Sequence, residues 1–333
     1  SIGADIVEMT GENRIMAYYG LKLINSSPRT GIKALMIKSG KTGTFSISDV
    51  VFGIAPRINA AGRIEHGKRA VEILIEEDTE KVKILADGIE NYNLHRKELD
   101  KNITEEALDM IDQNKKSTVV FSADWHKGVV GIVASRLIES HYKPTIVLSE
   151  KDDELTGSAR SVKGFDLYNA LLQCEHLLEK FGGHKYAAGL TVKKSNLDAF
   201  IKEFEKVVSK SITSDQLEPE IEVDMEIDIK NVTPKLYRII KQFAPFGPKN
   251  RTPNFVSKGV QDCGYGKKVG SDKSHLRLVL NTAEDQTITS IGFGMADCFE
   301  KTNENKNFDI CYTIDENKWQ GKTSLQIKLK DLK

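Results

Sequence analysis

The hydrophobic pattern of this chain changes its period once, and that change limits the folds that the chain can adopt. Between residues 80 and 113, apolar residues recur every three or four positions, which predicts one helix of about 50 Å. After a polar linker at 211–216 the period becomes two, because apolar residues at 221–229 alternate with Glu and Asp. We therefore expect an α/β part followed by a separate all-β part.

Residues 116–210 are expected to form the α/β part, with helices covering a mixed sheet. Strands are predicted at 118–122, 144–148, 156–160 and 187–192. A strongly apolar helix is predicted from residue 167 to 181, with Gly182 and Gly183 as the cap that ends it. Beyond residue 217, five or six short strands separated by turns predict a small barrel, for which an OB-fold is the specific expectation.

The first 50 residues have the pattern of the end of a domain whose beginning is missing. A helix is predicted at 13–24 and a strand at 34–37. A missing parallel sheet would have covered one face of such a remnant. We therefore expect the remnant to be mobile or to pack against a neighbouring part of the chain.

Three side chains are candidates for one phosphate-binding site. Glycines at 182 and 183 would let a phosphate approach the backbone, and the imidazole of His184 can hydrogen-bond its oxygen. Ser158 and Arg160 lie two residues apart on an extended segment and therefore point the same way, and Arg binds phosphate through two parallel bonds. Taken alone, the Gly-Gly-His segment reads more simply as a helix stop beside a surface histidine.

Two further segments carry candidate ligand contacts. The glycine-flanked loop at 124–131 opens a helix, which favours anions near His126, although Trp125 and His126 could equally fill the top of a core. The segment 57–63 places Arg57, Asn59 and Arg63 around small residues, and by itself it is read as a polar loop. On the long helix, most residues are expected only to pack, and the candidates to face a ligand are Asn93, Arg96 and Lys97.

Composition indicates an intracellular protein but does not identify a ligand. Lys plus Arg equals Asp plus Glu at 48 each, so only local clusters of charge can indicate nucleic acid. The four cysteines have no metal-type spacing and are typical of reduced thiols in a cytosol. No apolar run reaches membrane-spanning length, and no signal peptide opens the chain. We therefore expect a cytoplasmic protein without a membrane partner.

Six blocks, taken in order, resemble the carboxy-terminal half of the RecJ family, the single-strand-specific exonucleases of the DHH phosphoesterase superfamily. Together they extend over essentially the whole chain, and their order makes the resemblance specific. The blocks lie at residues 3–7 with 13–14, 54–63, 125–137, 157–160, 182–184, and 244–250 with 253 and 255.

The resemblance implies four parts: a DHH-domain remnant at 1–50, a substrate loop and connecting helix at 51–115, a DHHA1 domain at 116–210 and an OB-fold at 217–333. It implies removal of nucleotides from the 5′ end of single-stranded DNA in repair and recombination, with two Mn²⁺ or Mg²⁺ ions. Protein partners in repair are left open. The implied substrate-binding residues are Arg57, Asn59, Arg63, His126, Ser158, Arg160, Gly182, Gly183, His184, Lys268 and Arg277, and Asp5 is the implied metal ligand.

The metal-binding motifs of the family are missing from this sequence. It contains no Asp-x-Asp and no Asp-His-His segment, and Asp5 alone cannot hold two hard cations. We therefore expect a fragment that supplies substrate binding and is inactive by itself. Two alternatives stay open: a DHH-family phosphodiesterase for short oligonucleotides or cyclic dinucleotides, and a non-enzymatic protein that binds single-stranded DNA.

Overall fold

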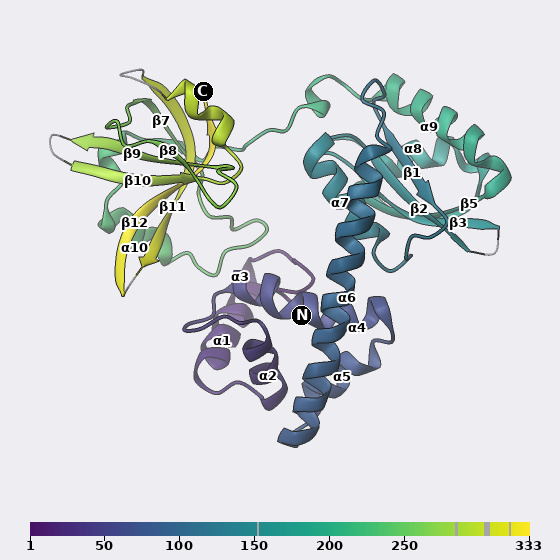
Figure 1. The fold of residues 1–333 in the computed structure, drawn as a ribbon, viewed down its shortest axis with the longest axis horizontal. Helices are drawn as coiled ribbons and strands as arrows, with labels where there is room; N and C mark the ends of the chain where they lie inside the picture. Colours follow the sequence, from purple (N-terminus) through teal and green to yellow (C-terminus); the bar gives the residue numbers. More distant parts are fainter. Residues whose placement is uncertain (152, 284–285, 303–306, 320) are drawn as a thin grey trace. The chain divides into compact units, whose positions relative to one another are not determined.

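The computed structural model describes residues 1–151, 153–283, 286–302, 307–319 and 321–333. The chain forms two compact units (Figure 1). The continuous unit consists of residues 24–220, and the split unit joins residues 1–23 to residues 221–333. The compact units thus divide the chain near 23 and 220, whereas the domain limits expected at 50, 115 and 210 stay predictions.

The continuous unit begins with helices packed around one long helix (Figure 1). The long helix, α6, runs over Thr79–Asp109, and the carboxylate of Asp78 caps it by accepting a hydrogen bond from the amide of Lys81. Leu35, Ile54 and Ile73 from the shorter helices meet Ala86 and Ile89 of α6 in a buried core. The shorter helices are α2 (Thr30–Lys38), α3 (Ile47–Asp49), a π-helical turn (Val50–Ile54), α4 (Ala55–Ile64) and α5 (Lys68–Ile75).

Two expectations for this helical part are wrong. Residues 34–37, predicted as a strand, lie in α2, because a short apolar run fits either period and here buries Leu35 among helices. Residues 57–63, read as a polar loop, lie in α4, where Pro56 occupies the first turn. The long helix itself is confirmed, since its apolar stripe extends over many turns.

A mixed sheet forms the second half of the continuous unit, as expected, but it has five strands where four were predicted. The pair β1–β2 is parallel, and the other pairs are antiparallel. Helices α8 and α9 cover one face around a core that includes Leu148, Leu190 and Phe204, and α6 and α7 pack on Val120 and Val147 of the other face. In spatial order the strands are β1 (Thr118–Ser122), β2 (Thr145–Lys151), β3 (Glu154–Arg160), β5 (Ala187–Lys193) and β4 (Leu178–His184), and the helices are α7 (Val130–His141), α8 (Leu167–Gln173) and α9 (Leu197–Ser211).

The predicted helix over 167–181 is wrong in its second half. Helix α8 ends at Gln173, a 3₁₀ turn follows at Glu175–Leu177, and Gly182 and Gly183 lie in β4. Pairing of β4 with β5 decides the conformation, since an added Cβ at Gly183 would lie 2.4 Å from the carbonyl oxygen of Ala187. The double glycine therefore permits a close strand pair and is not a helix cap.

Most of the split unit is a barrel. A parallel pair, β10–β12, joins two antiparallel ladders. The chain after β7 closes the barrel on β9, because the amide of Cys263 donates to the Val279 carbonyl (2.8 Å) and the amide of Asn281 donates to the Gln261 carbonyl (3.1 Å). In spatial order the strands are β6 (Met225–Glu226), β7 (Phe255–Val260), β11 (Phe308–Trp319), β12 (Lys322–Leu332), β10 (Gln286–Gly292), β9 (His275–Ala283) and β8 (Lys267–Val269), with helix α10 at Pro234–Lys241 and a 3₁₀ helix at Ala296–Lys301.

The alternating segment at 221–229 forms less strand than its pattern predicts. Only Met225–Glu226 pairs, at the edge of the sheet beside β7, and a 3₁₀ turn follows at Ile229–Asn231. The side chains of Ile221 and Val223 stay 39% and 46% exposed. Alternation therefore did not produce a long strand here, because no second strand covers this edge within the described residues.

The amino-terminal segment of the split unit is held by the loop that follows α10. Arg14, in helix α1 (Gly11–Ser26), donates to the carbonyls of Gln242, Phe243 and Ala244 at 3.1, 3.2 and 3.3 Å. The amide of Met9 donates to the Pro248 carbonyl at 2.8 Å. We call this set of contacts the Arg14 clasp.

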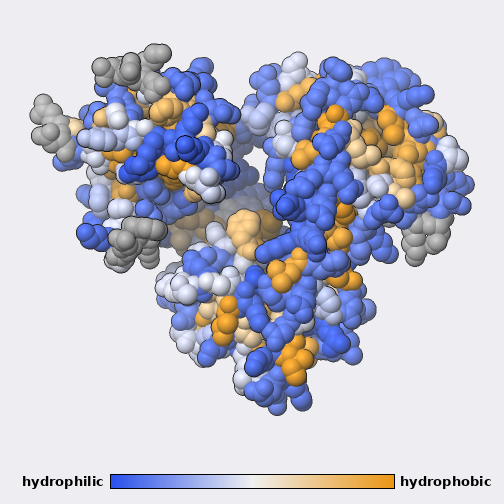
Figure 2. All heavy atoms as spheres, in the orientation of Figure 1, coloured by the Kyte–Doolittle hydropathy of each residue, from blue (hydrophilic) through white to orange (hydrophobic). Residues whose placement is uncertain are grey.

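Apolar side chains remain exposed on the amino-terminal helices. Ile15 and Tyr19 of α1 are 57% and 63% exposed, Ile37 of α2 is 69% exposed, and Phe52 is 79% exposed. Figure 2 shows a largely hydrophilic face that carries hydrophobic patches in this helical region. Among the described residues, no helix combines the length and the apolar character needed to cross a lipid bilayer.

Candidate phosphate-binding site

The strand register places Ser158, Arg160 and His184 on one face of the sheet. Arg160 lies opposite Ala187 of β5, which lies opposite His184 of β4. Residues directly opposite each other in neighbouring strands point to the same face, and so do residues two apart in one strand. Two strand spacings separate Arg160 from His184, because Ala187 of β5 lies between them. The imidazole and the guanidinium therefore lie on the same face but are not directly adjacent.

The same row of the sheet contains two glycines. Ser158 lies opposite Gly189, which lies opposite Gly182, and both glycines are exposed. Helix α7 packs on the β2–β3 side of this face, whereas His184 is exposed on the edge strand β4. A bare strip of backbone therefore extends from Ser158 towards the edge of the sheet.

Arg160 and Ser158 form the wall of a cavity of about 210 Å³, which we call the arginine cavity. The guanidinium of Arg160 donates to the hydroxyl of Ser158 at 2.7 Å. Burial lowers the pKa of Arg160, and the positive charge of Arg63 lowers it further. The cavity is lined by Arg63, Lys127, Gly128, Val130, Gly131, Thr156, Gly157, Ser158 and Arg160.

The first turn of α7 forms another side of the arginine cavity. An added Cβ at Gly131 would lie 3.2 Å from both the Arg160 guanidinium and the Ser158 hydroxyl, so the helix backbone approaches both groups closely. Amides in the first turn of a helix lack partners within the helix and favour a negative ligand. Two guanidiniums, a hydroxyl and a helix start thus surround one space, and an oxyanion such as phosphate matches all of them.

Arg63 reaches this cavity from the end of α4. Its guanidinium donates to the carbonyl of Gly128 at 3.0 Å, and an added Cβ at Gly128 would lie 2.3 Å from the Arg63 carbonyl oxygen. The ring of His126 accepts a hydrogen bond from the Gly128 amide at 3.1 Å. His126 therefore shapes the loop rather than lining the cavity.

Arg57 is not the exposed cleft residue that the sequence suggested. It is 7% exposed, pairs with the Glu90 carboxylate, and donates to the carbonyls of Gly53 and Lys38 at 2.6 and 2.7 Å. Its charge is satisfied inside the helical core. Asn59, two residues further along α4, is exposed and does not line the arginine cavity.

Sequence reasoning missed Lys127 and misjudged two residues of α6. Lys127 lines the arginine cavity, and its only signal was its place in the loop before α7. Asn93 and Arg96 were candidates to face a ligand, yet they are 0% and 9% exposed. A polar residue at the centre of an apolar stripe could have been recognised as buried from its position alone.

The register of the barrel separates the two cations proposed there. Arg277 lies opposite Lys267, whereas Lys268 lies opposite the buried Leu276. Lys268 and Arg277 therefore point to opposite sides of the β8–β9 ladder. The neighbour of Arg277 on its own side of this ladder is Lys267.

The expected metal ligand stands by itself in the described residues. Asp5 lies exposed in a turn before α1, and no group of three His, Cys, Asp or Glu side chains converges anywhere in the described part of the chain. A centre with two divalent ions needs several oxygen ligands at each ion. The residues present here do not fit such a centre.

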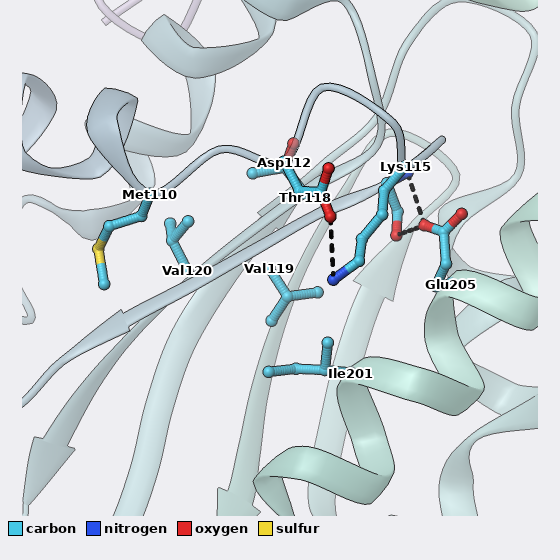
Figure 3. A pocket seen from close by; sticks show the side chains of 9 residues that line it. Met110, Asp112, Lys115, Thr118, Val119, Val120, Ile201 and Glu205 are labelled. Atoms are coloured by element: carbon cyan, nitrogen blue, oxygen red, sulfur yellow. Dashed lines mark hydrogen bonds and ion pairs between the residues drawn. The ribbon is translucent and has the colours of Figure 1, made fainter.

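A second, smaller cavity beside β1 is a packing feature (Figure 3). It holds about 40 Å³. The carboxylate of Glu205 accepts hydrogen bonds from the amides of Lys116 and Ser117 and from the Ser117 hydroxyl, at 3.0, 2.9 and 2.6 Å. Burial alone would raise the pKa of Glu205, but these bonds lower it. Glu205 thus anchors the start of β1.

Comparison with known proteins assigns both halves of this arrangement. The model of the DHHA1 domain matches residues 112–210, and the model of the RecJ OB domain matches residues 223–331. The fold thus defines a protein in which a DHHA1 domain precedes an OB domain. The matches confirm the expected combination of α/β and all-β architecture.

Curated relatives carry one name. The single-stranded-DNA-specific exonuclease RecJ of Bacillus subtilis is 31% identical to this chain, over 98% of the chain and 42% of that protein. RecJ of Escherichia coli is 28% identical, over 97% of the chain and 58% of that protein. The crystal structure of RecJ from Thermus thermophilus in complex with Mn²⁺ covers the whole chain with a TM-score of 0.85 and 25% identity.

The chain belongs to the RecJ family, and it corresponds to the carboxy-terminal part of that family's proteins. It spans about half the length of the curated relatives that it matches. Thermus thermophilus RecJ has been solved in complex with Mn²⁺ and in complex with Mg²⁺.

Proposed function

We propose that this chain is the substrate-binding part of a single-stranded-DNA-specific exonuclease that removes nucleotides from the 5′ end during repair and recombination. The observation that carries the proposal is the arginine cavity, where Arg63, Ser158 and Arg160 surround the first turn of α7. Names of relatives that act on single-stranded DNA support the choice of polymer.

In this proposal the chain places the strand, and the chemistry depends on ligands outside it. A phosphate of the DNA accepts hydrogen bonds from Arg63, Arg160 and the Ser158 hydroxyl in the arginine cavity. The bare strip at Gly189 and Gly182 lets the next part of the strand lie close to the sheet, with His184 at its end. Divalent metal ions, when bound by the complete protein, would activate the water that attacks phosphorus.

The barrel is proposed to hold the rest of the single strand. OB-folds bind oligonucleotides on the face of their second and third strands, which are β9 and β10 here. Arg277 and Lys267 lie side by side on this ladder, and His275 meets the exposed Phe293 at 5.2 Å between ring centroids. Cations beside exposed rings suit a phosphate backbone with stacked bases. Because the proposed substrate is single-stranded DNA, the proposal includes a location in the cytoplasm.

Removing the charge of the arginine cavity should weaken binding to single-stranded DNA. We expect Arg160→Gln to lower the affinity for an oligothymidylate about tenfold and to reduce the salt slope by about one, because one charged phosphate contact is lost. Fluorescence anisotropy at two salt concentrations measures both values. The matched control is Lys163→Gln, an exposed cation of the same domain that pairs with Glu220. Unchanged affinity and slope in Arg160→Gln would reject the cavity as the phosphate site.

The same titration separates the alternative substrates. A protein built for cyclic dinucleotides or very short oligonucleotides would show affinity that is independent of chain length. The proposed function requires affinity that rises with length until the strand also engages the barrel.

A further inference from the structure

Four arginines gather where helix α6 passes the arginine cavity, and one buried carboxylate serves two of them. Arg63 and Arg160 line the cavity, while Arg96 and Arg136 contact Asp100. Asp100 is 1% exposed. Glu139 adds a further negative charge near Arg136, which is the more exposed of the two arginines that contact Asp100.

Asp100 is shared unequally. Arg136 donates to both of its carboxylate oxygens, each at 2.9 Å. The guanidinium of Arg96 stays 3.7 Å from the nearer oxygen, and it donates instead to the side-chain carbonyl of Asn93 at 3.1 Å. Arg136 thus forms the closer, two-bond pair with Asp100, and the buried Arg96 makes only the longer ionic contact with it.

Two buried donors at this point have no acceptor among the described residues. They are the Nε of Arg96 and the side-chain amide of Asn93, which lie three residues apart on one side of α6. A buried charged group that is incompletely paired is costly, so its retention calls for a reason other than stability. A nearby anion would supply that reason.

Arg63 connects this buried charge to the cavity. Burial lowers the pKa of Arg96, the Asp100 carboxylate opposes this effect, and the positive charges of Arg63 and Arg136 lower the pKa further. The charge of Arg63 also lowers the pKa of Arg160, after the larger effect of burial. Arg63 is thus an electrostatic neighbour of both Arg96 and Arg160.

We propose that Arg96 sets the anion affinity of the arginine cavity through its electric field and without touching the ligand, and that Asp100 limits this affinity. The inference rests on the proposed function, because the anion is a phosphate group of single-stranded DNA. Arg96 is an electrostatic positioning residue: inside the protein its charge is screened far less by water and salt than that of a surface lysine. Because Arg96 is buried, it does not bind other anions directly.

The test uses the full chain with an oligothymidylate as the probe. One variant removes a positive charge and the other removes a negative charge. Arg96→Gln should weaken binding about fivefold, and Asp100→Asn should strengthen it by a similar factor, although both remove buried polar contacts and lower the melting temperature. Arg96→Lys keeps the charge and should bind like the wild type. The matched control is Lys101→Gln, an exposed charge on the same helix, which should change the affinity less than twofold.

The two neutral variants are expected to change the affinity in opposite directions. A purely structural role of Arg96 and Asp100 cannot produce that result. If Arg96→Gln and Asp100→Asn both weaken binding, or both leave it unchanged, the inference is overturned. The double variant Arg96→Gln with Asp100→Asn should return close to wild-type affinity and serves as a second measurement if one single variant fails to fold. When Arg160→Gln leaves binding unchanged, the proposed function has failed; when it weakens binding and the α6 variants do not change it in opposite directions, only this inference has failed.

Discussion

At the scale of single residues, two adjacent glycines differ in whether the fold requires a glycine at their position. Gly183 has φ +149°, and its position in the β4–β5 pair leaves no room for a side chain. Gly182, the preceding residue, has open space where a Cβ would be. The two glycines look equivalent in the sequence, and only the strand pairing distinguishes them.

Replacing Gly183 by Ala should destabilise the continuous unit by about 2–4 kcal/mol. The added Cβ would lie 2.5 Å from the Cα of Ala188, and backbone atoms cannot move aside as a flexible side chain can. Urea unfolding followed by circular dichroism measures the change. Gly182→Ala is the matched control and should stay within about 1 kcal/mol of the wild type. Equal losses in the two variants would contradict the strand pairing described here.

At the scale of elements, the Arg14 clasp joins α1 to the loop after α10. The three carbonyls that accept from Arg14 belong to Gln242, which caps α10, and to Phe243 and Ala244, which follow the helix. One planar guanidinium can satisfy several of them because its donors diverge in a fixed fork. The clasp therefore holds the segment that carries Asp5 to the rest of the split unit.

Arg14→Ala should release the amino-terminal segment from the rest of the split unit. Loss of hydrogen bonds from a charged donor should cost about 2 kcal/mol, so amides near Met9 should exchange with solvent faster. Hydrogen exchange read by mass spectrometry locates the change. Glu12→Gln, an exposed change in the same turn of α1, should leave exchange near Met9 as it is. Unaltered exchange in Arg14→Ala would show that the clasp does not hold this segment.

At the scale of the whole molecule, binding and chemistry are predicted to be separate. The purified chain should bind single-stranded DNA but release no nucleotides above background with Mn²⁺ or Mg²⁺, since Asp5 is not joined by further ligands in the described residues. End-labelled oligonucleotides resolved on gels provide the measurement. Metal-dependent release that disappears in Asp5→Asn would refute the prediction.

The sequence by itself determined the parts with long or repeated patterns. The apolar stripe of α6 extends over 31 residues, and a pattern of that length admits only a helix. The strands at 118–122 and 145–151 were also predicted, from apolar runs bounded by turns. The ordered motifs indicated the RecJ family, because a motif is recognised from its residues and their order, and the tertiary structure is not needed for that. Ser158 and Arg160 were also accessible to sequence reasoning, since period two places them on one face of a strand.

Only the tertiary structure decided where short patterns are ambiguous and where partners are distant in the chain. Residues 34–37 and 178–184 suit either helix or strand, and the neighbouring elements selected the conformation. The sequence suggested that Arg57 and Arg96 are exposed cations. In the structure both are buried, and they contact Glu90 and Asp100 respectively. The physical reason is that burial, pairing and electric field depend on groups brought together by folding, and local sequence does not contain their distances.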